Sequence, residues 1–412
     1  MRTFSTDTAS YCFAPLHAAL KRNVDQNYLA GASHTILLGR NVVDTGCVGW
    51  ADKEAGVALR PDHIFRIMSN TKLITTCAVM LLVESGRIAL DDPIERYIPQ
   101  LGRRQVLRPG ASVITDTEPA RNAITVRHLL SHTSGLSYGL LDPGTMIFKA
   151  YREAKVLHPS VSLAGLMDVL ADLPLLFHPG TAWEYSVATD VLGRLIEVIS
   201  GQRLDAFFEQ RITGPLGMPD TSFVLPPEKQ PRLVAYYAGV NLLDPNVPNL
   251  KRVDHLPWPG AYVQPAPLQK AGGGMVSTLA DMVALVRSLL PGGPTLLKPE
   301  SIAEMMRDQL PAGSYIRFAQ LGEVKGKGFG LGGSVTHIPS SIDPPGSEGE
   351  FQWGGMAGTH WWISPKANLA GVLMAQRFMG FWNPYAHEFK RLAYAAVTKP
   401  PVPCNLHENP VQ

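Results

Sequence analysis

Hydrophobic and polar positions follow two periods along the chain, and these periods distinguish helices from strands. An amphipathic stretch at residues 13–24 comes before two β-like runs at 32–38 and 42–50. The turn-prone Gly39-Arg40-Asn41 separates the two runs. The pattern predicts a helix followed by a β-hairpin.

The next apolar segment, 72–83, has the pattern of a buried helix that begins just after Ser69 and ends near Gly86. From there to about residue 270, strand signals are sparse and long loops separate short helical patterns. We expect these helices at residues 126–130, 163–170, 187–199 and 204–212.

Beyond Gly274 the pattern changes again, to a helix at 279–290, β-like runs and a last helix at 385–396. The β-like runs lie at residues 329–335, 351–353, 359–363 and 370–375. Because both ends of the chain supply strands, the simplest packing is one antiparallel sheet flanked by the first and last helices. The predicted fold is therefore α/β (α+β), with a mostly helical domain inserted into a sheet domain.

The domain boundaries follow from the same pattern. We expect a sheet domain formed by residues 1–70 and 271–398, a mostly helical domain at 71–270, and an irregular tail at 399–412. A cleft between two such domains is a favoured place for a ligand.

Composition and charge narrow the partners. The 412 residues are 45% hydrophobic and 17% charged, and the net charge of +2 comes without a long run of either sign. This excludes an electrostatic footprint for nucleic acid or an anionic membrane and favours small, roughly neutral partners. No window approaches 18 apolar residues, and the N-terminus lacks a signal-peptide pattern, so a cytoplasmic location is predicted.

The four cysteines are far apart and show no C-x-x-C spacing, which argues against a zinc ribbon or a redox pair and leaves free thiols as the expectation. His128 and His132 have metal-ligand spacing on a predicted helix, but no third ligand is near them in sequence. We therefore expect neither a metal nor a cofactor.

The segment from Ser69 to Lys72 is the only S-x-x-K of the chain. On a helix these two side chains share a face, so the amine can reach the hydroxyl and help to activate it as a nucleophile. The alternative is that Ser69 only caps the helix while Lys72 points to solvent.

Two further segments favour the catalytic interpretation. Residues 179–186 form a turn followed by an aromatic-rich entry into a helix and include Tyr185, and residues 353–356 lie on a late strand. The G-x-S-x-G motif typical of α/β-hydrolases is absent from the sequence.

Together these motifs resemble those of the penicillin-binding protein and class C β-lactamase superfamily, and most closely its family VIII carboxylesterases. The resemblance covers nearly the whole chain and includes residues 129–136, 214–218, 220–221, 272–278 and 328–332. It implies a β-lactamase-like fold.

The resemblance also implies the catalytic roles. Ser69 matches the nucleophile, Lys72 the motif lysine and Tyr185 the tyrosine that reaches the nucleophile from the helical domain. A tyrosine serves as a base near neutral pH only if a nearby cation favours its deprotonated form, and Lys72 is the expected source. The backbone N–H groups of Ser69 and Met356 are expected to form the oxyanion hole.

Two departures from the β-lactamase pattern indicate the substrate. Val187 stands where the second motif usually has asparagine, and Trp353 stands where the third motif usually has lysine. A cation suited to a substrate carboxylate is therefore missing. We expect Trp353, Gly354, Gly355 and Tyr138 to contact the substrate.

The predicted function is a serine carboxylesterase that hydrolyses small neutral esters through an acyl-enzyme. Two enzymatic alternatives remain: acyl transfer to an alcohol, and β-lactam or D-peptide hydrolysis with weak β-lactam activity. A binding module that has kept the fold without catalysis is the non-enzymatic alternative. The sequence does not determine the oligomeric state.

Overall fold

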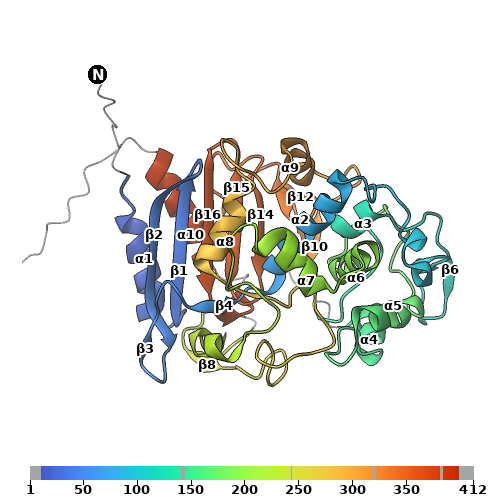
Figure 1. Cartoon of the computed structure of the whole chain (residues 1–412), viewed down its shortest axis with the longest axis horizontal. Helices are drawn as coiled ribbons and strands as arrows, with labels where there is room; N and C mark the ends of the chain where they lie inside the picture. The colour runs from blue at the N-terminus through green and yellow to red at the C-terminus, as the bar shows by residue number, and fades with distance from the viewer. Residues whose placement is uncertain (1–10, 141–143, 243, 319–321, 381–383, 399–412) are drawn as a thin grey trace, which may run out of the picture.

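The computed structural model describes residues 11–140, 144–242, 244–318, 322–380 and 384–398. The predicted tail at 399–412 lies outside this range. An eight-stranded sheet with the order β12-β13-β14-β15-β16-β1-β2-β3 forms one half of the molecule, and helices α2 to α7 gather in the other half (Figure 1). The strands of this sheet are β1 (Gly31–Leu38), β2 (Asn41–Asp52), β3 (Val57–Ala58), β12 (Lys327–Phe329), β13 (Ser334–Thr336), β14 (Phe351–Gly355), β15 (Thr359–Ser364) and β16 (Leu369–Ala375).

Strands from the two ends of the chain meet in the middle of the sheet, as predicted. β1 pairs antiparallel with β16 over seven residues, from Ala32 opposite Ala375 to Leu38 opposite Leu369. Because side chains alternate along a strand, neighbouring residues serve different cores. Ile36 packs toward α1 and α10, whereas Leu37 belongs to the large core that contains α8 and α2.

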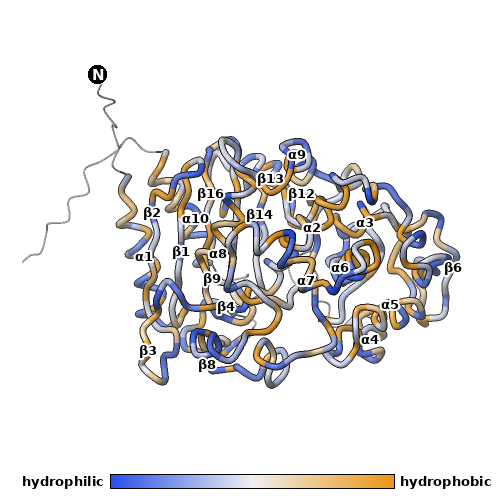
Figure 2. The backbone as a smooth tube through the Cα atoms, viewed as in Figure 1, coloured by the Kyte–Doolittle hydropathy of each residue, from blue (hydrophilic) through white to orange (hydrophobic). Residues whose placement is uncertain are grey.

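The helices cover both faces of the sheet. α1 packs against α10 on one face, and α8 lies against β1, β15 and β16 on the other. Hydrophobic residues concentrate along the strands and the inner helices, while hydrophilic stretches lie at the periphery, for example near β8 (Figure 2). The helices are α1 (Ala14–Asp25), α2 (Thr71–Glu84), α3 (Val126–Leu130), α4 (Met146–Glu153), α5 (Leu163–Ala171), α6 (Ala188–Ser200), α7 (Leu204–Phe208), α8 (Leu279–Arg287), α9 (Pro299–Met306) and α10 (Pro384–Thr398).

Short ladders complete the fold. β4 and β9 form an antiparallel pair that joins the segment before Ser69 to the segment after Gly274. The remaining strands are β4 (Ile64–Arg66), β5 (Gln105–Leu107), β6 (Thr117–Pro119), β7 (Tyr237–Gly239), β8 (Leu250–Arg252), β9 (Val276–Thr278), β10 (Ile316–Phe318), β11 (Gly322–Val324) and β17 (Arg377–Phe378).

The structure corrects three sequence-based expectations. The run 329–335 is not one strand, because Gly332 adopts a positive φ of 85° and turns the chain between β12 and β13. The helices α4 and α9 lie where the sequence pattern predicted none. Cys47 and Cys77 are free, but Cys12 is disulfide-bonded, a pairing for which the sequence spacing gives no signal.

No helix among the described residues is both long enough and apolar enough to cross a membrane. The disulfide at Cys12 argues against a cytoplasmic location, because disulfides are rare in cytosolic proteins. The cytoplasmic location therefore stays a prediction.

Candidate active site

Helix α2 carries Lys72, and the turn that leads into this helix carries Ser69. Eleven of its residues are buried, as expected of a helix whose sequence is apolar on nearly all sides. At its C-terminus, Gly86 has a positive φ of 69° and its N–H donates to the carbonyl oxygen of Val83, which confirms the predicted glycine stop.

Ser69 lies in the short 3₁₀ turn, Met68–Asn70, that leads into α2. Met68 has a positive φ of 47°, so the backbone bends sharply just before the serine. The N–H of Ile67 donates to the carbonyl oxygen of Met275 (3.1 Å), and the N–H of Met275 donates to Thr71 Oγ1 (3.2 Å). The turn is therefore held from both sides by the chain that follows Gly274.

Tyr185 reaches Ser69 from the segment that precedes α6. Its Oη donates a hydrogen bond to Ser69 Oγ at 2.8 Å. Lys72 Nζ lies 4.6 Å from the centroid of the Tyr185 ring, and the Lys72 side chain is almost completely buried. The three residues of the predicted catalytic group are thus brought together.

Lys72 does not make the expected contact with Ser69 but contacts Gly272 in its place. Lys72 Nζ donates to the carbonyl oxygen of Gly272 (2.6 Å) and not to the hydroxyl of Ser69. The lysine is therefore placed to act on Ser69 through the ring of Tyr185, since that ring lies against both groups.

His132 contacts the segment that carries Tyr185. Its Nδ1 is 3.1 Å from Ser186 Oγ, and its ring lies 4.9 Å from the Tyr185 ring. Burial and the positive charge of Lys72 hold the pKa of His132 well below its usual range. The imidazole is therefore neutral and cannot compete with Lys72 as the local cation.

Trp353 has a contact that the sequence did not indicate. Its indole Nε1 donates a long hydrogen bond to Tyr185 Oη (3.4 Å), and its ring lies 5.4 Å from that of Tyr185. The indole N–H is therefore a second polar group beside Tyr185, in addition to Lys72.

The end of β14 is fixed against the turn that carries Ser69. A Cβ on Gly355 would lie 2.3 Å from the carbonyl oxygen of Ile67, and Thr359 Oγ1 donates to the same oxygen at 3.1 Å. The close approach therefore requires glycine at 355, where β14 ends beside the segment that leads to Ser69.

Tyr138 and Gly354, the other predicted substrate-binding residues, each lie against an aromatic ring. Tyr138 is buried and stacks on Tyr185, with ring centroids 5.8 Å apart and an interplanar angle of 11°. Gly354 faces His360, since a Cβ there would lie 2.8 Å from the imidazole Nδ1.

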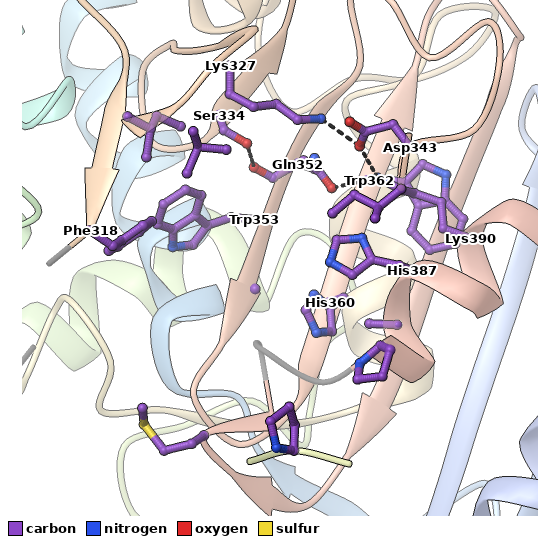
Figure 3. Close-up of a pocket in the computed structure, with 18 of the residues that line it drawn as sticks. Phe318, Lys327, Ser334, Asp343, Gln352, Trp353, His360, Trp362, His387 and Lys390 are labelled. Carbon is purple, nitrogen blue, oxygen red and sulfur yellow. Dashed lines mark hydrogen bonds and ion pairs between the residues drawn. The ribbon is translucent and has the colours of Figure 1, made fainter. Parts of the chain in front are cut away.

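A cavity of about 700 Å³ borders the site, and Trp353 and Gly354 line it, whereas Ser69, Lys72 and Tyr185 do not. Figure 3 shows Phe318 and Trp353 on one side of it and a charged group on the other. In that group Lys327 pairs with Asp343 at 2.7 Å, and Lys390 donates to Gln352 Oε1 at 2.9 Å. The cavity is large enough for a drug-sized molecule and opens beside Trp353.

Possible metal ligands meet elsewhere in the described part of the chain. Nitrogen and oxygen atoms of His17, His34 and Asp44 lie within 4.8 Å of one another, and both imidazoles already contact the carboxylate, at 3.0 and 2.8 Å. His128 caps α3, because its Nδ1 accepts from the N–H of Thr125, so it does not act together with His132.

Comparison with known proteins identifies the family. The Beta-lactamase family model matches residues 16–395, so the chain belongs to this family. The chain is 36% identical over 369 residues to Protein Rv1367c of Mycobacterium tuberculosis, covering 87% of this chain and 88% of that protein. It is 31% identical over 408 residues to Esterase EstB of Burkholderia gladioli, covering 95% and 97% of the two chains.

Among solved structures, EstCE1, described as a hydrolase with promiscuous acyltransferase activity, superposes with a TM-score of 0.77 at 26% identity. The match covers 92% of this chain and 97% of that one. These findings confirm the predicted family and fold, and they support the prediction of a serine ester hydrolase.

Proposed function

We propose that the chain is a carboxylesterase that hydrolyses small neutral esters through an acyl-enzyme on Ser69. The observation that carries this proposal is the 2.8 Å hydrogen bond between Tyr185 Oη and Ser69 Oγ, with Lys72 Nζ 4.6 Å from the tyrosine ring. A serine next to a base that is itself held by a third group is the usual arrangement of an activated nucleophile.

The reaction has two halves. Tyr185, with Lys72 and the Trp353 indole beside it, is the general base that takes the proton of Ser69 as the serine oxygen attacks the ester carbonyl. The N–H groups of Ser69 and Met356 hold the negative oxygen that forms. Tyr185 then returns the proton to the departing alcohol, and water repeats the sequence on the acyl-enzyme.

Acyl transfer is a second candidate, because EstCE1 combines hydrolysis with promiscuous acyltransferase activity on the same fold. The cavity beside Trp353 offers room for an acceptor alcohol in place of water. The test is product analysis with a p-nitrophenyl ester and an added alcohol. The acid as main product supports hydrolysis, whereas a new ester as main product supports transfer.

Substrate charge gives a prediction of its own. A lysine at position 353 could pair with a substrate carboxylate, and a charge-assisted hydrogen bond contributes about 1.5 to 3 kcal/mol. We expect the wild type to favour a neutral short-chain ester over an anionic chromogenic cephalosporin by about tenfold to a few hundredfold in kcat/KM from this contact, at about 1.4 kcal/mol per tenfold. The Trp353→Lys variant should narrow this preference.

Trp353→Phe is the matched control, since it removes the indole N–H without adding a cation, and it should leave the preference between the two substrates unchanged. If the wild type hydrolyses the cephalosporin as well as the ester, another residue supplies the cation and the preference for neutral substrates is wrong.

A further inference from the structure

A fully buried carboxylate, that of Asp190, lies next to the active-site lysine. Asp190 is the third residue of α6, where the helix N-terminus favours an anion. Its Oδ1 accepts a hydrogen bond from the N–H of Gly272 (3.0 Å). Its Oδ2 is buried and has no hydrogen-bond partner in the described part of the chain.

Gly272 connects this carboxylate to Lys72. The same residue that donates its N–H to Asp190 accepts a hydrogen bond at its carbonyl oxygen from Lys72 Nζ (2.6 Å). A Cβ on Gly272 would lie 2.9 Å from Asp190 Oδ2 and 3.3 Å from Lys72 Nζ. The carboxylate and the ammonium therefore both lie against the Cα of Gly272, where a larger residue would have to displace one of them.

The charge of Lys72 needs compensation, because a buried ammonium without an opposite charge is unstable. Besides Asp190, the charged and titratable groups around Lys72 and Asp190 are Tyr185, Tyr138, His132 and Lys270. Of these, Asp190 is the acid, His132 is neutral and Lys270 is a second cation. Burial raises the pKa of Asp190, whereas the charges of Lys270 and Lys72 lower it.

We propose that Asp190 is a positioning residue that, through Gly272, holds the ammonium of Lys72 in place so that Lys72 can act on Tyr185. The inference rests on the proposed function of Ser69, Lys72 and Tyr185. Asp190 itself does not touch the substrate, so its effect passes entirely through the lysine.

Asp190→Asn tests the role with little change in shape. We expect kcat to fall at least about tenfold with little change in KM, and the alkaline limb of the kcat profile to move at least about one pH unit lower. The reason is that the carboxylate of Asp190 interacts electrostatically with the Lys72 ammonium, so its loss removes a buried negative charge that stabilises this cation. An active variant whose profile is not shifted would overturn the inference.

Asp281→Asn is the matched control. Asp281 is also a buried aspartate at the third position of a helix, α8, where it accepts hydrogen bonds from the N–H of Asp220 (2.9 Å) and from Thr221 Oγ1 (2.8 Å). Its loss should lower the melting temperature without moving the pH profile. An equal shift in both variants would mean that the effect of Asp190 is only structural.

If the Asp190→Asn single variant does not fold, melting temperatures of other variants give an independent test. Lys72→Met leaves the buried carboxylate without this cation, so Lys72→Met/Asp190→Asn should melt at a higher temperature than Lys72→Met. A double variant that melts no higher than Lys72→Met would contradict the inference. So would a higher melting temperature on adding Asp190→Asn to Lys270→Met but not to Lys72→Met. A wild type that a fluorophosphonate does not label at Ser69 would instead refute the proposed function.

Discussion

Replacing Ser69 by alanine is expected to reduce ester turnover by at least about 10⁴-fold, because the variant lacks the oxygen that forms the acyl-enzyme. Ser69 is half-buried and its side chain is small, so the fold should persist. The measurement is kcat/KM on a p-nitrophenyl ester, together with circular dichroism and the melting temperature.

Ser288→Ala is the control for this variant. Ser288 follows the last residue of α8, the helix that packs on the sheet, and its Oγ donates to the carbonyl oxygen of Leu285 at 2.7 Å. It should keep wild-type turnover. A Ser69→Ala protein that is folded and keeps a tenth or more of the activity would contradict the assignment of the nucleophile.

The second large effect concerns Lys72 and Tyr185 as a pair. Lys72→Met and Tyr185→Phe should each lower kcat by about 10³-fold or more, and the double variant should be little worse than either. The non-additivity follows from geometry, because Lys72 reaches Ser69 only through the tyrosine ring. Wild-type activity should also fall on the acid side, as expected of a reaction that needs a general base.

The measurement is a double-mutant cycle in kcat at constant pH with saturating ester. If the two losses multiply fully, the residues act independently and the shared proton-transfer role is wrong.

The proximity of the three candidate catalytic residues was predictable from the sequence because two of them are three residues apart. The S-x-x-K spacing indicates that Ser69 and Lys72 belong to one site, and the aromatic-rich entry to α6 indicates Tyr185. The central sheet was also predictable from local signals, since β1 and β16 are short runs of eight and seven residues that are buried along nearly their whole length.

What the sequence missed depends on contacts between distant segments. Asp190 and Gly272 are 82 residues apart, and Lys72 and Gly272 are 200 apart. Periodicity places Asp190 on the buried face of a helix, and an acidic residue at such a position indicates a buried partner. Periodicity does not identify the cation that Asp190 faces. The hydrogen bond from Trp353 to Tyr185 likewise joins residues 168 apart.

Short elements were missed because local signals compete. In the run 329–335 the apolar residues suggest a strand, but the glycines between them permit the tight turn that the structure adopts. The pairing of β13 with β14 determines where the second strand lies, and the local sequence pattern does not encode this pairing.

The central claim, that Ser69 forms the covalent intermediate, is tested most directly by mass spectrometry of the wild-type chain after reaction with a fluorophosphonate. We predict one adduct per chain, which peptide mapping places on Ser69, and none on the folded Ser69→Ala variant. An adduct on any other residue, or no adduct on a folded wild type, would contradict the claim.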